Sequence, residues 1–230
     1  MRTFVLIPGA GGSAWIWSRV TPFLVEAGHE AIAVDLPGDD ETAGLPRYTE
    51  LVVDAIGSSP DVVLVAGSLG GFTAPLVCER VPVRELVLVN AMIPDPGETA
   101  HDWWAHTVAL EAQDEAARAG GYGPFDVATY FLHDIDPEGE PYQRSEADIV
   151  FDSVCDFEAW PAIGIRVLAG QDDRFFLSAC SAGPLGTGSV SRPTCFRVGT
   201  CCRSRSRGWW PTICCRRAAW VTFAEPVAVA

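Results

Sequence analysis

Short apolar runs alternate with amphipathic stretches along the first half of this chain. Runs rich in β-branched residues and bounded by glycine, proline or aspartate predict strands at residues 3–7, 31–34, 62–66 and 85–90. Apolar residues at helical spacing predict helices at residues 15–27, 48–56 and 69–80. The buried face of the first helix is predicted to carry Trp15, Val20, Phe23 and Leu24. Strands that alternate with helices at this spacing indicate an α/β fold, a mostly parallel sheet with helices on both faces.

The pattern changes between residues 94 and 161, which are acidic, aromatic and helical only in places. Helices are predicted at residues 103–119 and 127–132, and the glycine-rich run 120–124 separates them. We interpret this segment as a small helical lid, because an apolar run at 165–169 then resumes the sheet. The predicted domains are a core formed by residues 1–93 and 162–176, a lid at 94–161, and a tail at 177–230.

The tail differs abruptly in composition from the rest of the chain. Residues 1–176 hold 9 Arg against 29 acidic residues, a net charge of −20, whereas residues 177–230 hold 7 Arg against Glu225, a net charge of +6. Six of the 8 cysteines lie in the tail. No secondary-structure period is visible beyond Phe176, so we predict that this tail is aberrant and poorly ordered.

Charge and hydropathy exclude several classes of partner. A net charge of −14 makes nucleic acid and anionic membranes poor partners for most of the chain. No apolar run approaches the roughly 18 residues of a membrane span. The first residues, 1–7, are too short and too weakly charged for a signal peptide, and we expect a cytoplasmic protein. The sequence leaves the oligomeric state open.

The tail itself leaves weaker alternatives open. Its adjacent cysteine pairs lack the Cys-x-x-Cys spacing of zinc sites, and a disulfide framework requires an exported protein. The basic run 203–207 is of a kind that contacts nucleic acid, but the acidic residues 1–176 oppose such binding.

Ser68 is the candidate nucleophile. It follows the apolar run 62–66 and precedes the helix 69–80, within the small residues of Ala66-Gly-Ser-Leu-Gly-Gly. A serine at such a strand–turn–helix junction is exposed at the carboxyl edge of the sheet, where the helix N-terminus favours negative charge. The alternative is an ordinary turn with an incidental serine. The context favours a nucleophile elbow.

A second glycine-rich turn comes after the first strand, at Pro8-Gly-Ala-Gly-Gly. Such a turn can aim a backbone N–H at the carbonyl oxygen that Ser68 attacks, so we predict an oxyanion hole formed by the N–H groups of Ala10 and Leu69. The alternatives are a simple βα loop or a nucleotide-phosphate loop. No Gly-Lys-Ser/Thr follows, and the glycine spacing alone is weak for a dinucleotide site.

The candidate acid is Asp172 or Asp173, at the end of the strand 165–169. A carboxylate there can orient an imidazole, and we prefer Asp173. The alternative is a solvated turn in which the carboxylates pair with Arg174. The chain holds 4 histidines, and all of them precede Asp173. They are His29, His101, His106 and His133.

Three of these histidines lie in the predicted lid, which also carries an aromatic set. One of them could replace a missing base, but we interpret His101, His106 and His133 as lid-surface or pocket residues. The aromatic residues are predicted to form the lid core and a pocket wall, which favours an apolar acyl or aryl substrate. These residues are Trp103, Trp104, Tyr130 and Phe131.

With these motifs in order, residues 1–176 resemble the α/β-hydrolase superfamily, especially its small lid-bearing esterases. The first-strand segment Val5–Trp17, the elbow around Ser68 and the loop Leu168–Phe176 are each similar to a family motif. The resemblance implies an α/β-hydrolase fold in which Asp173, the second aspartate of its loop, is the triad acid. It also implies a small-molecule ester substrate, with no metal and no organic cofactor. Pro8 stands where the family usually has histidine, and the family's catalytic histidine has no counterpart.

A shifted reading frame is our hypothesis for the tail. The shifted frame is read from the third base of the Trp209 codon, with Arg216 and Arg217 taken as CGN codons. It gives Val-Ala, two residues that are each Asp, Asn, His or Tyr, then Leu or Met, Leu, and Pro or Ser, and with C or G at wobble bases it continues toward Pro-Gly-Gly. In this family an acid-bearing apolar strand and such a turn precede the histidine, and residues 221–228 resemble the family segment just after it. We hypothesise a frame excursion that begins near residues 176–180 and ends near 219–220, where the histidine codon is lost. A sequencing error or a genuine mutation would each produce it.

The sequence therefore supports two hypotheses of function. The first is a serine carboxylesterase for small apolar esters, impaired in this exact chain because the histidine is absent. The second is a non-catalytic or vestigial ligand-binding protein of the same fold. Lyase or cofactor-free peroxidase chemistry also stays open, because a fold does not fix a reaction.

Overall fold

The computed structural model describes residues 1–133, 144–170 and 172–176, together with the backbone of three short strands at 194–196, 213–214 and 220–221. Its main sheet has the strand order β2-β1-β3-β4-β5-β6, and every neighbouring pair is parallel. The strands are β1 (Thr3–Ile7), β2 (Glu30–Ala33), β3 (Val62–Gly67), β4 (Glu85–Val89), β5 (Gly164–Gly170) and β6 (Thr194–Phe196). The predicted parallel α/β sheet is confirmed.

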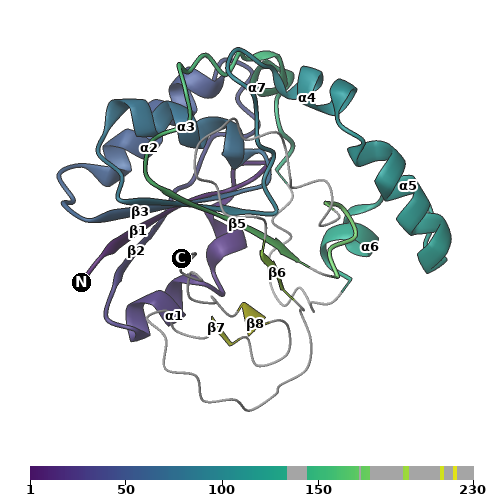
Figure 1. Cartoon of the computed structure of the whole chain (residues 1–230), viewed down its shortest axis with the longest axis horizontal. Coiled ribbons are helices and arrows are strands. Elements are labelled where there is room, and N and C mark those ends of the chain that lie inside the picture. The colour runs from purple at the N-terminus through teal and green to yellow at the C-terminus, as the bar shows by residue number, and fades with distance from the viewer. Residues whose placement is uncertain (134–143, 171, 177–193, 197–212, 215–219, 222–230) are drawn as a thin grey trace, which may run out of the picture.

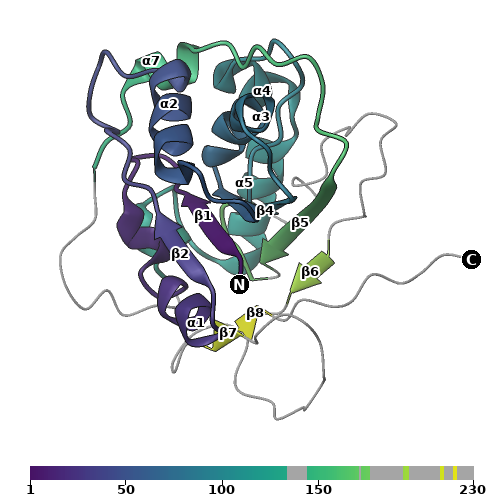
Figure 2. The same ribbon diagram turned by 90° about the vertical axis from the view of Figure 1, so that its left-hand side faces the viewer.

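Helices cover both faces of this sheet. In Figures 1 and 2, α2 and α3 lie above it and α1 lies beneath it. The helices that precede β5 are the 3-10 helix η1 (Ala14–Trp17), α1 (Thr21–Glu26), α2 (Leu45–Ile56), α3 (Gly70–Arg80), α4 (Ala100–His106), α5 (Ala109–Gly120), α6 (Val127–Phe131) and α7 (Asp148–Asp152). Among the described residues no helix is long and apolar enough to cross a membrane.

Alternate residues of each strand enter different hydrophobic clusters. On β1, Val5 and Ile7 belong to the cluster beneath α2 and α3, whereas Phe4 and Leu6 pack with Trp17. This period of two is the expected consequence of strand geometry, in which successive side chains point to opposite faces. Both sets are buried, so the apolar runs of the sequence reflect a sheet covered on both sides.

The predicted helix over residues 15–27 is wrong as a single element. The structure has η1 and α1 instead, and Pro22 stands in the first turn of α1. Proline lacks the N–H that a continuing helix needs and clashes with the preceding turn, so the helix has to restart there. Trp17 is buried, whereas the predicted Trp15 is only half-buried.

The segment between β4 and β5 carries α4 to α7, as the lid prediction requires. Its two connections to the core lie side by side, because Glu98 and Cys155 form an antiparallel bridge. The predicted helix 103–119 is interrupted at Thr107 and Val108, and α4 and α5 are separate helices. Figure 1 shows α5 projecting away from the sheet.

The tail lies largely outside the described residues. Within it, β6 adds a parallel strand to β5, with Leu168 opposite Thr194. A separate antiparallel pair is formed by β7 (Ile213–Cys214) and β8 (Trp220–Val221). The pattern of the sequence does not predict these strands. The frame excursion near residues 176–220 and the poor order of the tail remain predictions.

Candidate active site

Ser68 occupies a strained turn between β3 and α3. Its backbone has a φ of 50°, in the left-handed region that side chains other than glycine rarely adopt. A residue held in this conformation costs about 1–3 kcal/mol and persists where the surroundings fix it. Here the Ser68 N–H donates to Val89 O, and its carbonyl accepts from Met92 N and Gly71 N. The turn leaves the Ser68 side chain half-buried at the carboxyl edge of the sheet.

The glycine-rich turn after β1 packs directly against Ser68. A Cβ on Gly9 would lie 2.8 Å from Ser68 Cβ and 3.3 Å from its Oγ, so only glycine fits there without displacing the serine. The turn is closed by a hydrogen bond from Gly12 N to Gly9 O, at 3.1 Å. Two segments that are far apart in sequence therefore meet at the serine hydroxyl.

The two predicted oxyanion donors both adjoin this contact. Ala10 follows Gly9 at the exposed tip of the turn, and Leu69 follows Ser68 at the start of α3. Within the described part of the chain neither the Ala10 N–H nor the Leu69 N–H donates to any acceptor. Unpaired backbone donors beside a nucleophile are what an oxyanion hole requires. Their assignment to that role remains a prediction.

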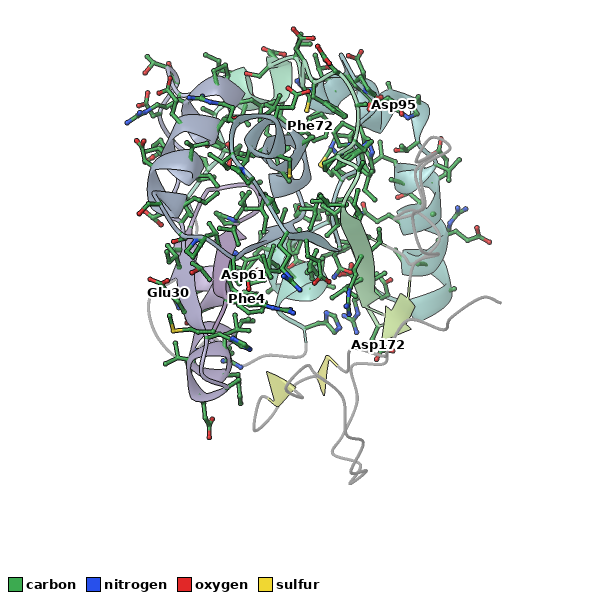
Figure 3. All side chains as sticks on the ribbon, turned by 60° about the vertical axis from the view of Figure 1, so that its left-hand side comes forward. Phe4, Glu30, Asp61, Phe72, Asp95 and Asp172 are labelled. Carbon is green, nitrogen blue, oxygen red and sulfur yellow. The ribbon has the colours of Figure 1, made fainter. Side chains whose placement is uncertain are left out.

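Asp173 is held in a defined position at the end of β5. Its Oδ1 accepts hydrogen bonds from the N–H groups of Phe175 and Phe176, at 2.8 and 2.6 Å, and its Oδ2 accepts one from Asn90. Asp172 is exposed and lies away from the core residue Phe72 in Figure 3. The structure therefore fixes Asp173 and leaves Asp172 in solvent, in line with the preference for Asp173.

Asn90 connects the acid to the elbow, and sequence reasoning missed this role. It directly follows β4, whose last residue Val89 lies opposite Gly67 and accepts from the Ser68 N–H. The Asn90 side chain donates to Asp173 Oδ2 at 2.5 Å and accepts from Gly170 N at 2.7 Å. The available signal was a polar residue at the carboxyl end of the strand adjacent to the elbow.

An aromatic cluster packs the lid onto the acid loop. The rings of Trp104 and Phe176 stack with their centres 5.8 Å apart, and Phe131 lies 4.6 Å from Phe175. Trp103 is buried and its indole N–H donates to Ile93 O. The predicted lid core is thus also the support of the segment that carries Asp173.

A pocket of about 500 Å³ lies elsewhere in the lid. Its lining comes from α5, the residues just after it and Tyr130 of α6, and it includes Tyr122 and Phe125. Neither Ser68 nor Asp173 lines it. Tyr130 lines a cavity that is separate from the nucleophile, and the aromatic wall of a substrate pocket stays a prediction.

His29 lies at the opposite edge of the sheet from Ser68. It directly precedes β2, at the amino ends of the parallel strands, and its Nδ1 accepts from Arg2 N. Its ring centre is 5.2 Å from that of Phe4. Burial is the largest cause of a lowered pKa for His29. Because it lies at the opposite edge of the sheet, this imidazole cannot act as the base for Ser68.

The three lid histidines have different surroundings. His101 and His106 are exposed on α4 and contact Asp152 and Glu98, at 3.4 and 2.6 Å. His133 has a buried Nδ1 with no hydrogen-bond partner among the described residues. None of the three contacts Ser68 or Asp173 in the described structure. The structure thus brings Ser68, the glycine turn and Asp173 to one edge without placing an imidazole between them.

The described residues contain no group of three or more His, Cys, Asp or Glu side chains able to hold a metal ion.

A comparison with known families decides the identity of the fold. The model of the alpha/beta hydrolase family matches residues 4–199.

The chain belongs to the alpha/beta hydrolase family.

The resemblance stated from the sequence is thereby confirmed, and the match extends past Phe176 into the tail. Polyneuridine aldehyde esterase from Rauvolfia serpentina is 35% identical over 110 residues, which are 43% of this chain and 42% of that protein. Methylesterase 7 from Arabidopsis thaliana is 36% identical over 161 residues, 59% of this chain and 61% of that protein. The chain thus spans about two fifths of the length of the first of these relatives.

Solved structures agree on the fold. A pyrethroid hydrolase from Sphingobium faniae superposes with a TM-score of 0.63 at 19% identity, covering 85% of this chain and 88% of that one. An extracellular alpha/beta-hydrolase from a Paenibacillus species gives a TM-score of 0.58 at 20% identity, covering 86% and 89%. At these identities the likeness establishes the alpha/beta-hydrolase fold alone.

Proposed function

We propose that this chain is a serine hydrolase of small apolar carboxylic esters that lacks its general base. The observation that carries the proposal is Ser68 in a left-handed turn, next to the N–H groups of Ala10 and Leu69, which have no acceptor among the described residues. The names of its relatives support the reaction class, since they include polyneuridine aldehyde esterase and methyl jasmonate esterase 1 of Vitis vinifera.

In the proposed reaction, Ser68 Oγ attacks the ester carbonyl carbon and forms a tetrahedral intermediate. The Ala10 and Leu69 N–H groups stabilise the negative charge that develops on the carbonyl oxygen. The Oγ proton must pass to a base and then to the leaving alcohol, after which water hydrolyses the acyl-serine. Asp173 would orient the imidazole that carries this proton.

This exact chain has no histidine after Asp173, so water or a buffer base has to accept the proton. Loss of a triad base lowers the rate by about four to six orders of magnitude. We therefore propose residual activity only. If the frame excursion is real, a histidine near residues 219–220 supplied the base in the intact ancestor.

The missing imidazole also favours the second hypothesis, a ligand-binding protein that keeps the fold without turnover. Reaction type varies among the relatives, one of which is norfluorocurarine synthase 1 of a Strychnos species. The two hypotheses differ in their predictions for Ser68. An enzyme forms a covalent bond at its hydroxyl, whereas a binding protein saturates with ligand and leaves it unmodified.

Covalent labelling tests the proposal. The protein is incubated with a fluorophosphonate in the presence of imidazole, which can accept the Oγ proton as fluoride leaves, and the labelled peptide is located by mass spectrometry. Label on Ser68 that is absent from Ser68→Ala supports the hydrolase. Equal labelling of both proteins, or no label with saturable ester binding, supports the binding protein instead.

A further inference from the structure

Residues 144–147 form the segment of the lid that leads into α7, here called the stem, and they contact the core loops after β1 and β2. The Arg144 guanidinium contacts both carboxylate oxygens of Asp35, at 2.8 and 2.9 Å, and donates to Leu36 O at 2.8 Å. Three residues on, the Ala147 N–H donates to Gly38 O at 2.7 Å. These contacts fix the stem to the loop that comes after β2.

Between these two anchors, Glu146 contacts the glycine turn beside the nucleophile. Its Oε2 accepts the N–H of Gly11 at 2.5 Å, and its Oε1 accepts the hydroxyl of Tyr48 at 2.5 Å. Tyr48 is buried on α2, so the carboxylate is held from the core side as well as by the stem. Each oxygen thus has a specific donor, and the side chain has a defined orientation.

The conformation of the glycine turn makes this contact possible. Gly11 has a φ of 82°, the value typical of the third residue of a type II turn, and Gly12 N closes that turn on Gly9 O. A Cβ on Gly11 would lie 2.5 Å from Arg144 O. Glycine is needed both for the turn and for the approach of the stem.

Ala10 is the second residue of the same turn, directly before Gly11. A peptide N–H is rigidly planar with the preceding carbonyl, so a bond at the Gly11 N–H fixes the peptide that joins Ala10 to Gly11. With the Gly12–Gly9 bond on the other side, the orientation of the Ala10 N–H is set from both directions. The lid stem is in this way linked to the predicted oxyanion donor.

The role of Glu146 in this link is geometric rather than electrostatic. A carboxylate one residue away from an oxyanion donor opposes negative charge on the reacting oxygen. Burial raises the pKa of Glu146, while the bonds from Tyr48 and Gly11 and the charge of Arg144 act in the opposite direction. A neutral amide of the same shape should therefore position the turn equally well and remove the unfavourable charge.

We propose that Glu146 is a positioning residue of the oxyanion hole, which it shapes by holding the Gly11 N–H against the lid stem. The inference rests on the proposed function for the task that the Ala10 N–H performs. The contact of Glu146 with Gly11 does not depend on that function, and the two can be tested apart.

The experiment compares Glu146→Ala, Glu146→Gln and the control Glu41→Ala. Glu41 is an exposed glutamate that lines the same surface pocket as Glu146, so its removal changes the charge without touching Gly11. Thermal unfolding verifies that each variant folds. Amide hydrogen exchange is measured on peptides that contain Gly11, and imidazole-supported hydrolysis of p-nitrophenyl butyrate is measured after subtraction of the Ser68→Ala rate.

In Glu146→Ala, exchange at Gly11 should accelerate about tenfold, because the amide loses its acceptor. The Ser68-dependent kcat should fall about tenfold with KM changed less than about twofold, since the loss affects charge that develops only in the transition state. Glu146→Gln should restore the exchange rate and give a kcat at least equal to that of the unmodified chain, because its carbonyl accepts from Gly11, its amide donates to the Tyr48 oxygen and the unfavourable charge is gone. Glu41→Ala should match the unmodified chain.

Unchanged exchange at Gly11 in Glu146→Ala would overturn the proposal, as would faster exchange with an unchanged Ser68-dependent kcat. A kcat of Glu146→Gln as low as that of Glu146→Ala would also overturn it, because the negative charge, and not the geometry, would then be what catalysis needs. If the unmodified chain and Ser68→Ala hydrolyse the ester equally, the proposed function fails. In that case the exchange measurement alone still decides whether Glu146 holds the turn.

Discussion

Asn90 and Asp173 are joined by a hydrogen bond of 2.5 Å from the asparagine amide to the Asp173 carboxylate. The two residues come from the ends of neighbouring parallel strands, β4 and β5. Asn90 also has a φ of 42°, and its side chain accepts from Gly170 N at the start of the acid loop. The pair therefore fixes the acid loop against the strand next to the elbow.

The side chain of Asn90 is expected to stabilise the fold as well as to place Asp173. Replacement by glycine relieves the positive φ but deletes both hydrogen bonds, and replacement by alanine deletes them while retaining the strain. We predict that Asn90→Gly lowers the free energy of unfolding by about 1–3 kcal/mol, the cost of leaving a partly buried carboxylate without this donor. Asn90→Ala should cost about 1 kcal/mol more, because alanine is disfavoured at this φ.

Denaturant unfolding of the three proteins checks both values. Equal stability of Asn90→Ala and Asn90→Gly would show that the backbone conformation relaxes in the variants. Stability equal to that of the unmodified chain would show that the bond to Asp173 contributes nothing.

Elements with local signals could be predicted from the sequence. A buried strand, small residues and a following helix, all within a short stretch, indicate the elbow around Ser68. The parallel sheet is indicated by alternating strands and helices. The roles of Asn90 and Glu146 could not be predicted, because each depends on a partner brought near by the fold: Asp173 for Asn90, and Gly11 for Glu146.

The structure also differs from the sequence prediction in the lengths of two helices. The apolar spacing of residues 15–27 suggested one helix, although Pro22 requires a new start and Trp17 takes the buried position. The helix break at Thr107 and Val108 has no proline or glycine to mark it. The sequence favoured Asp173 over Asp172 only through the position of Asp173 in the loop, whereas the difference in their burial and contacts depends on the fold.

Glu98 should make the fold sensitive to pH. Its carboxylate is 9% exposed and contacts His106 at 2.6 Å, and burial is the main cause of its raised pKa. A group whose pKa is higher in the folded than in the unfolded state favours folding below its unfolded value, and that contribution is lost as pH rises through the folded value. We predict a loss of stability above about pH 4.5, the ordinary value for glutamate.

Glu98→Gln should flatten this part of the pH profile, because glutamine does not titrate and still accepts from Asp95 N. Thermal unfolding between about pH 4 and 8 measures the difference between the two proteins. A profile for Glu98→Gln parallel to that of the unmodified chain would contradict the assignment to Glu98.

The aromatic contact between lid and acid loop should carry much of the local stability. Phe176 is 3% exposed and packs on both Trp103 and Trp104. We predict that Phe176→Ala lowers the free energy of unfolding by about 3–5 kcal/mol, the usual cost of deleting a buried ring. Phe125→Ala is the matched control, because Phe125 is 52% exposed and should cost about 1 kcal/mol or less. Similar losses in the two variants would contradict the proposed support of the acid loop.

The genomic DNA tests the account of the tail. We predict that re-sequencing of codons 170–225 reveals compensating insertions and deletions, with a histidine codon restored after Pro-Gly-Gly. The abrupt change of net charge at Phe176 and the cysteine-rich tail are the reasons. DNA that reproduces the sequence as given would exclude a sequencing error and favour the ligand-binding hypothesis.

Ester hydrolysis with and without imidazole is the most direct test of the central claim, that Ser68 is a nucleophile without a base. The measured quantity is kcat/KM for p-nitrophenyl butyrate, with the rate of Ser68→Ala subtracted. We predict a value near background for the unmodified chain, and a rise of about tenfold or more when imidazole supplies the missing proton acceptor. Rapid Ser68-dependent turnover without imidazole would contradict the missing base, and equal rates for the two proteins at every imidazole concentration would contradict the nucleophile.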